Sequence, residues 1–243
     1  MRIGALRAQA RAEVVMTLRR GETLLVTIGI PVMLLVFFSL VHVLPTGTPR
    51  HPIDFLAPGV LSLAAMSTAM VSLGIATAFE RSYGVLKRLG TTPLGRPALL
   101  AAKIAGVLAV EVLQVAVLAA TAVALGWRPH VGALEAIPAY LLGTIAFAGI
   151  GLAMAGALRA EVTLAAANGL YVVLLLVGGI LFPVGKLGPL ADAARLLPAT
   201  QLSAAMRTTL QPHAGAVSPG AWIVLSAWAL AMPLLAAATF KWE

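Results

Sequence analysis

Long apolar runs are the feature of this sequence that most restricts what it can fold into. A helix that crosses the hydrocarbon core of a bilayer needs about 20 consecutive, mostly apolar residues. Six runs meet that requirement: Leu24–Leu44, Ala57–Phe79, Ile104–Leu125, Pro138–Leu158, Leu164–Val184 and Gly220–Phe240. Only one acid or base, Glu111, lies inside any of them. The pattern predicts six transmembrane segments.

The composition excludes the soluble alternatives. Of the 243 residues, 60% are hydrophobic and 11% are charged, against roughly 45–50% and 25% in soluble domains. Because lipid offers no hydrogen bonds to the backbone, each run is expected to be a helix. We therefore expect an all-α integral membrane protein, with residues 1–243 forming a single transmembrane domain. The absence of cysteine excludes a disulfide scaffold, a thiolate metal site and a cysteine nucleophile.

Residues 1–23 are predicted to form an amphipathic helix rather than a cleaved signal peptide. Apolar residues recur at helical spacing among arginines: Ile3, Leu6, Ala10, Val14 and Leu18 alternate with Arg2, Arg7, Arg11, Arg19 and Arg20. The basic start is longer than that of a signal peptide, and the apolar run that follows is long enough to span the membrane. A helix of this kind lies in the headgroup plane. A solvated basic leader is the alternative reading.

The basic residues predict the orientation of the chain. If the N-terminus is cytoplasmic, 12 lysines and arginines fall on the inner side and 5 on the outer side. Inner loops carry the basic excess in membrane proteins. We therefore expect a multi-pass protein of a cytoplasmic membrane with both termini inside. We therefore expect the net charge of +8 to attract anionic membrane lipids rather than nucleic acid.

Two long segments connect the predicted spans. The first, residues 80–103, is expected on the cytoplasmic side and contains a short amphipathic turn. Its apolar residues Val85, Leu86 and Leu89 face away from Lys87 and Arg88, and Thr91-Thr92-Pro93 ends it. From the residues alone, a helix that transmits force from a partner and a simple topological anchor are equally supported. The second segment, residues 185–219, predicts two short half-buried external helices with a break at Leu197-Pro198.

These segments carry a resemblance to a known family. Glu80-Arg81-Ser82-Tyr83-Gly84, followed by Leu-Lys-Arg-Leu and Thr-Thr-Pro, resembles the loop between the second and third spans of bacterial ABC-2-type transporter permeases. Gly179-Ile180-Leu181-Phe182-Pro183 and the later Leu196-Leu197-Pro198 resemble the outer end of the fifth span in that family. The ending Phe240-Lys241-Trp242-Glu243 is also similar. Ser82-Tyr83 and Gly90 depart from the commoner acidic, polar or basic residues.

The resemblance implies an exporter of the drug, lipid or polysaccharide type. Such permeases form a dimeric pore, as a homodimer or with a homologous permease, driven by a separate ATP-binding subunit that holds ATP and Mg. It implies coupling to that subunit through Glu80, Arg81, Gly84, Leu86, Lys87, Arg88, Leu89, Thr91, Thr92 and Pro93. It also implies an external gate that contains Gly179, Phe182, Pro183 and Pro198.

No cofactor is expected on this chain itself. A phosphate loop needs Gly-x-x-x-x-Gly-Lys-Ser/Thr, whereas the lone Gly185-Lys186 is followed by leucine and lies on the predicted outer side. The four histidines lack the spacing of a zinc helix, so no metal site is predicted. The chain is expected not to be an enzyme by itself.

Three polar residues in the spans are candidates for a pore or subunit contact: Glu111, Gln114 and Asn168. A charge inside the bilayer costs on the order of 3 kcal/mol, so Glu111 should face protein or water. An ordinary inter-helix hydrogen bond, or protonation in place, is the alternative. In the fourth span, Gly149/Ala153 and Gly151/Ala155 form small-x-x-x-small pairs, which favour close helix packing.

Two other function classes remain open on the residues alone. A secondary transporter usually places several acids and broken helices near the midplane, and here one Glu111 stands alone. A membrane enzyme that modifies lipids would need clustered carboxylates, and an intramembrane serine protease would need a serine and a histidine meeting at depth. The residues favour neither over the transport subunit.

Overall fold

In the computed structural model, the chain is a bundle of helices. The structure describes residues 3–19, 21–41, 52–90, 95–128, 133–180, 184–211 and 215–240, and these contain helices and turns without a strand. The first half comprises α1 (Ile3–Arg19), α2 (Gly21–Leu40), α3 (Pro52–Met66), the π-helix η1 (Ser67–Ser72), α4 (Leu73–Ser82), α5 (Val85–Gly90) and α6 (Arg96–Ala124). The second half comprises η2 (Ala133–Glu135), α7 (Ala136–Ala157), α8 (Ala160–Val177), η3 (Val184–Leu190), α9 (Ala191–Ala194), α10 (Pro198–Leu210) and α11 (Pro219–Thr239).

Five helices are long and apolar enough to cross a membrane. They are Pro52–Ser82, Pro97–Ala124, Ala136–Ala157, Ala160–Val177 and Pro219–Thr239, and a sixth apolar helix, Leu24–Leu40, is shorter. All six overlap the segments expected from the sequence. The third begins at Pro97 rather than Ile104. The fifth was expected to continue to Val184 but ends at Val177, where the chain bends through Gly178 and Gly179. Gly179 has φ +70°, a conformation that favours glycine.

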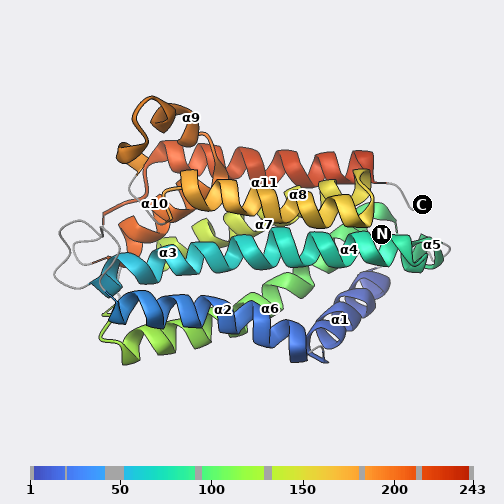
Figure 1. The fold of residues 1–243 in the computed structure, drawn as a ribbon. Helices are drawn as coiled ribbons and strands as arrows, with labels where there is room; N and C mark the ends of the chain where they lie inside the picture. The colour runs from blue at the N-terminus through green and yellow to red at the C-terminus, as the bar shows by residue number, and fades with distance from the viewer. Residues whose placement is uncertain are drawn as a thin grey trace.

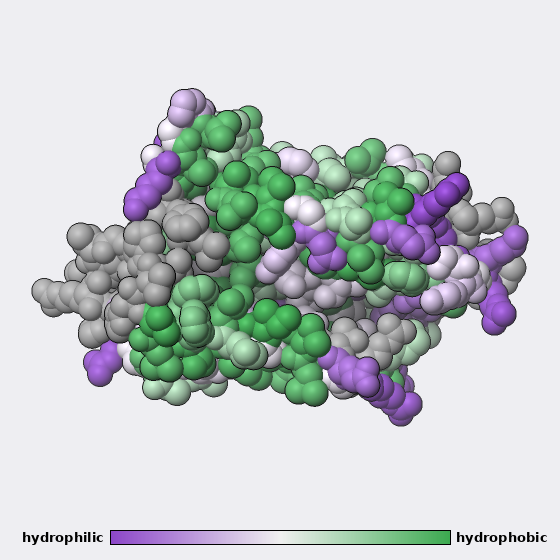
Figure 2. Space-filling view, viewed as in Figure 1, coloured by the Kyte–Doolittle hydropathy of each residue, from purple (hydrophilic) through white to green (hydrophobic). Residues whose placement is uncertain are grey.

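The long helices lie side by side and give the bundle two distinct ends (Figure 1). One end, which we call the α5 end, carries α1, α5 and the C-terminal end of α11. The other, the α10 end, carries α9, α10 and the start of α11. Figure 2 shows apolar residues along the middle of the bundle, while the strongly hydrophilic residues gather mostly at the α5 end.

Helix α7 is approached closely at its glycines by neighbouring helices on several sides. A Cβ added to Gly149 would lie 2.6 Å from Cδ of Pro233 in α11, and one added to Gly151 would lie 2.5 Å from the carbonyl oxygen of Met70 in η1. At Gly143 it would lie 2.7 Å from Leu202 of α10. The small residues of this span therefore serve close packing, as the sequence pattern indicated.

The second span contains a π-helical turn in its middle. Helices α3 and α4 are continuous through η1, and Met66 and Leu73 on either side keep helical dihedral angles. Such turns insert one extra residue into an α-helix and often accompany functional sites. Here Thr68 of η1 donates a hydrogen bond to Oε1 of Gln114 in α6 at 3.1 Å.

The segment after the fifth span breaks where the sequence indicated. Leu197 is extended, with φ −83° and ψ 140°, and α10 begins at Pro198. Before this break lie the 3₁₀-helix η3 and the single turn α9 rather than one longer helix. The positive φ of Gly188 and the ring of Pro189 interrupt any regular α-helix there.

Substituting Gly151 by alanine should destabilise the bundle. The new methyl would meet the backbone of Met70, which cannot rotate away as a side chain can, so α7 and η1 must separate at a cost of about 1–3 kcal/mol. A matched control is Gly169→Ala in α8, where a Cβ meets nothing within 4 Å. Thermal unfolding in detergent micelles measures the effect. Equal unfolding temperatures for the two variants would contradict this packing.

Candidate functional site

At the α5 end a sharp turn joins α4 to α5. Helix α4 ends at Ser82, and Gly84 takes φ +71° before α5 begins at Val85. An L-residue with a side chain pays roughly 1–2 kcal/mol for this left-handed conformation, which gives a physical reason for Gly84. The amide of Gly84 donates to the carbonyl of Arg81 at 3.0 Å, and the amide of Arg88 donates to the carbonyl of Gly84 at 3.3 Å.

Helix α5 turns one apolar side inward. Leu86 is completely buried in the core of this chain, and Leu89 packs against the same core. Leu86 is therefore not available to a partner protein. The accessible apolar side chains are Tyr83, which is 74% exposed, and Val85, which is 42% exposed. Lys87 and Arg88 are also exposed. Thr91, Thr92 and Pro93 lie outside the described residues.

A buried lysine connects α1, α4 and α6. The Nζ of Lys103 in α6 lies 2.6 Å from Oε2 of Glu80 and 3.2 Å from Oε1 of Glu13, and its side chain is 1% exposed. Glu13 comes close to α6 because Gly106 lacks a side chain: a Cβ there would lie 3.1 Å from Cβ of Glu13. The helix expected at the membrane surface is thus held to the ends of the second and third spans by charge. We call Glu13, Glu80 and Lys103 the junction triad.

Arg81 ties the same turn to the fourth span. Its guanidinium donates to the carbonyl of Gly156 at 2.5 Å and to the carbonyl of Leu158. These carbonyls lie at the C-terminal end of α7, where helices leave acceptors without partners and where positive charge is favourable. The turn before α5 is therefore fixed to three spans.

At the α10 end another arginine performs a similar task. Arg207 of α10 donates to the carbonyl of Gly179 and, at 2.7 Å, to that of Ile180, and its guanidinium lies 3.9 Å from the centre of the Phe55 ring in α3. Burial lowers the pKa of Arg207 to about 10, which leaves it charged at neutral pH. Pro198, the first residue of α10, is buried, whereas Phe182 and Pro183 lie outside the described residues.

The three polar residues expected at a pore or subunit contact have different surroundings. Gln114 is fully buried and bonds to Thr68 and to the carbonyl of Thr27. Glu111 accepts a hydrogen bond from Thr144 of α7 at 2.6 Å. Asn168 lies on the exposed side of α8 and donates to the carbonyl of Leu164, one turn earlier. The structure therefore does not gather them into one patch.

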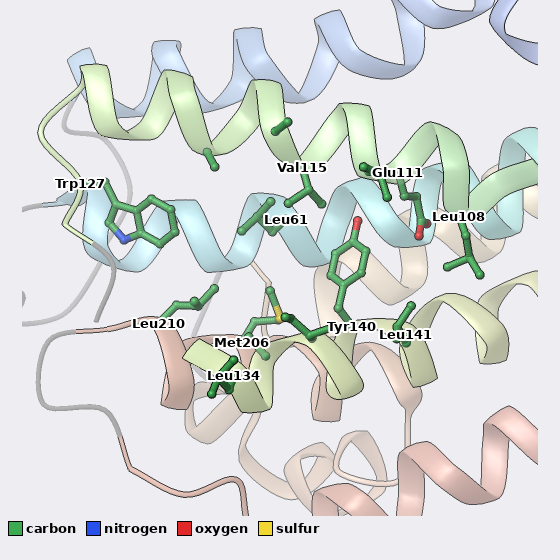
Figure 3. A pocket seen from close by; sticks show the side chains of 15 residues that line it. Leu61, Leu108, Glu111, Val115, Trp127, Leu134, Tyr140, Leu141, Met206 and Leu210 are labelled. Carbon is green, nitrogen blue, oxygen red and sulfur yellow. The ribbon is translucent and has the colours of Figure 1, made fainter. Parts of the chain in front are cut away.

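Glu111 instead lines a cavity of about 600 Å³ between α3, α6, α7 and α10. Figure 3 shows Glu111 and Tyr140 extending from α6 and α7 into the space between these helices, with Trp127 at the far end. The Oε1 atom of Glu111, the hydroxyl of Tyr140 and Nε1 of Trp127 are buried, with no hydrogen-bond partner among the described residues. The rest of the lining is apolar.

Within the described residues, no group of three or more histidine, cysteine or acidic side chains could hold a metal ion. The four histidines all lie outside this part of the chain.

This fold is that of a multi-pass helical membrane protein. A short helix is fixed at one end of two of its spans. The chain belongs to the ABC-2 type transporter family, whose pattern matches residues 5–210. It is thus a membrane subunit of an ABC transporter, and permeases of this family rely on separate ATP-binding subunits. A comparison with curated proteins finds no match.

Sequence reasoning did not find the junction triad. Glu13 is an acid within a basic segment and Lys103 is a base just before a predicted span, but nothing in the spacing pairs residues 13, 80 and 103. Thr144 and Tyr140 were also missed as neighbours of Glu111, because their contact depends on how α6 and α7 pack.

Replacing Lys103 by methionine should destabilise the α5 end strongly. Removing one partner of a buried ion pair leaves uncompensated charge, here on Glu13 and Glu80, at a cost of about 3–5 kcal/mol. The exposed pair Arg195–Asp192, at 3.0 Å, is the control, because removing such a pair changes stability by less than about 1 kcal/mol. Thermal unfolding in micelles compares Lys103→Met with Arg195→Met.

A triple variant separates charge from packing. The triple variant Glu13→Gln/Glu80→Gln/Lys103→Met leaves no charge unpaired, so most of the stability lost in Lys103→Met should return. If the triple variant is as unstable as Lys103→Met alone, the ionic interpretation of the junction triad is wrong.

Proposed function

We propose that this chain is the membrane-spanning subunit of an ATP-driven exporter in a bacterial cytoplasmic membrane. Two copies, or one copy and a homologous permease, would line the substrate path, while separate subunits bind ATP and Mg. Family membership supports the ABC transporter class, and the likeness of both long loops to exporter permeases supports the direction of transport. The junction triad is the observation that carries the coupling mechanism.

Helix α5 has the properties required of a coupling helix. It is short and follows a fixed turn, and Tyr83 of that turn is exposed beside Val85, Lys87 and Arg88 of the helix. Its inner residue Leu86 is embedded in the bundle, so a push on α5 reaches the spans without being absorbed by a loose loop. Arg81 and the junction triad pass that displacement to α1, α6 and α7.

The two ends of the bundle fit opposite sides of the membrane. The α5 end gathers hydrophilic side chains (Figure 2) and agrees with the basic excess expected on the cytoplasmic side. In this orientation α1 lies at the cytoplasmic surface, and both ends of the chain are cytoplasmic. The α10 end, where Arg207 holds α10 against Gly179 and Ile180, would close the outer side of the path.

The exposed face of α8 supports a dimer. Val172, Val173 and Leu176 are each about half exposed on this helix, and the polar Asn168 is exposed beside them. Polar residues in membrane helices usually face protein or water rather than lipid. A second permease seated against α8 would give Asn168 such surroundings.

Aspartates at Tyr83 and Val85 should abolish coupling without preventing membrane insertion. Both side chains are exposed, so the bundle should tolerate the change. An acidic patch would replace the apolar contact with the ATP-binding subunit, and a buried unpaired charge costs several kcal/mol, which is more than a hundredfold in affinity. Co-purification of the ATP-binding subunit and transport in vesicles measure the loss.

Two further variants sharpen this test. Leu196→Asp changes another exposed apolar residue, at the α10 end, and should retain the ATP-binding subunit. Leu86→Asp should fail earlier, by unfolding, because its side chain is buried. If Tyr83→Asp/Val85→Asp is inserted, binds the subunit normally and transports, α5 is only a topological anchor.

Cysteine labelling should place α9 outside the cell and the α4–α5 turn inside. The chain has no cysteine, so single substitutions report without background. Asp192→Cys, at a side chain 89% exposed, should react with an impermeant maleimide added to whole cells. Ser82→Cys, at an exposed residue, should react only after lysis. The reverse pattern would invert the orientation.

A further inference from the structure

The cavity between α6 and α7 contains polar groups that the described part of the chain leaves without hydrogen-bond partners. Glu111 is 2% exposed and Tyr140 is 9% exposed. Thr144 satisfies one carboxylate oxygen of Glu111, but among the described residues neither Oε1 nor the hydroxyl of Tyr140 has a hydrogen-bond partner. Buried polar groups are normally hydrogen-bonded, and those that are not call for an explanation. Here both point into the same cavity (Figure 3).

The rest of the cavity has the properties of a small-molecule site. Its volume of about 600 Å³ lies within the range of about 300–1,000 Å³ that is typical of ligand pockets, which are mostly apolar with a few converging polar groups. The rim residues Val112, Leu134 and Ile137 are well exposed, so the cavity opens on the surface of the helix bundle.

The carboxylate of Glu111 indicates which kind of ligand group the cavity would bind. A carboxylate with one free oxygen takes a hydrogen-bond donor, and a positive donor gives the stronger, charge-assisted bond. The described residues that line the cavity include no lysine, arginine or histidine. The ring of Tyr140 beside the carboxylate can also attract a cation through its π face.

We propose that this cavity binds a lipophilic amine, with its protonated nitrogen between Glu111 and Tyr140 and its apolar body along α6 toward Trp127. The site rests on the proposed membrane placement of the chain alone and requires neither the ATP-binding subunit nor transport.

The depth of Glu111 argues for a small molecule rather than a lipid headgroup. Glu111 lies near the middle of α6 (Arg96–Ala124), roughly 20 Å from either end at about 1.5 Å per residue. Phospholipid headgroups lie outside a hydrocarbon core about 30 Å thick. A headgroup amine would have to be drawn deep into the core to reach the carboxylate, whereas a small lipophilic amine dissolves there.

Energy transfer from Trp127 provides a direct test. The full chain is placed in phosphatidylcholine nanodiscs, whose headgroups carry no N–H donor, and titrated with monodansylcadaverine, a dansyl fluorophore with a primary amine. We expect saturable dansyl emission on tryptophan excitation. The signal should fall in Trp127→Phe, because Trp127 is the tryptophan that lines the cavity within the described part of the chain. The N-acetyl derivative of the probe, which has no charge, is the matched ligand.

Two variants test the polar end and the cavity separately. Glu111→Gln retains the shape and an acceptor for Thr144 but loses the charge, and should weaken amine binding at least tenfold while leaving the N-acetyl probe unchanged. Ala116→Phe fills the cavity and should abolish binding of both probes. Leu113→Phe, on the same helix but outside the lining, should bind like the wild type. Thermal unfolding of each variant confirms that it is folded.

Each outcome decides the proposal. Equal affinity of the amine for the wild type and a folded Glu111→Gln would show that the carboxyl is simply protonated in place, and would overturn it. Binding that is lost when phosphatidylethanolamine replaces phosphatidylcholine would assign the site to a lipid headgroup instead. Absence of a saturable signal from the folded wild-type chain would also overturn it. None of these results bears on coupling through α5.

Discussion

Close backbone contact along α7 is the constraint on which the rest of this structure depends. Within a membrane, burying apolar side chains provides little force between helices, because lipid is equally apolar. Packing must therefore come from close approach. Gly149 admits Pro233 of α11, and Gly151 admits the backbone of η1. Proline removes a backbone donor and projects its ring, so a facing glycine is the residue that gives it room.

The α5 end depends on a different interaction. There α5 is too short for long helix contacts, and the junction triad adds charge to the packing of α1 against α6. Such an arrangement holds only while all three members are present. Without Lys103 the two acids would lack a positive partner, and without the acids the buried lysine would lack a negative one. Arg81 and Arg207 repeat this logic at the two ends of the bundle by satisfying carbonyls where helices terminate.

The sequence predicted the helical membrane fold well because that information is local. Each span is a continuous apolar run, and the proline at 198 marks a break by its own covalent geometry. The surroundings of Leu86 were not predictable in the same way. An amphipathic turn shows which residues share a side, but it does not show whether that side faces the bundle or a partner. The ends of spans also escaped prediction, since Leu181–Val184 continues the apolar run beyond the turn at Gly179.

The candidate sites were predictable only in part, for a related reason. Glu111 was recognisable as the single charged residue in a span, but its partners come from another helix. Gln114 is three residues away on the same helix, yet the two side chains bond to different helices. Contacts among residues far apart in sequence arise from the rotation of each helix about its axis, which no local pattern specifies.

That rotation is altered inside the second span by η1. A π-turn carries one residue more than the α-helical turn that it replaces, and one residue corresponds to about 100° around a helix axis. Helix α3 packs against α2, α6, α10 and, less extensively, α7, whereas α4 packs mainly against α7 and α8. The continuous second span thus contacts partly different helices on the two sides of η1. The extra residue acts as a phase shift: it allows a single span to belong to two sets of neighbours without a break in the backbone.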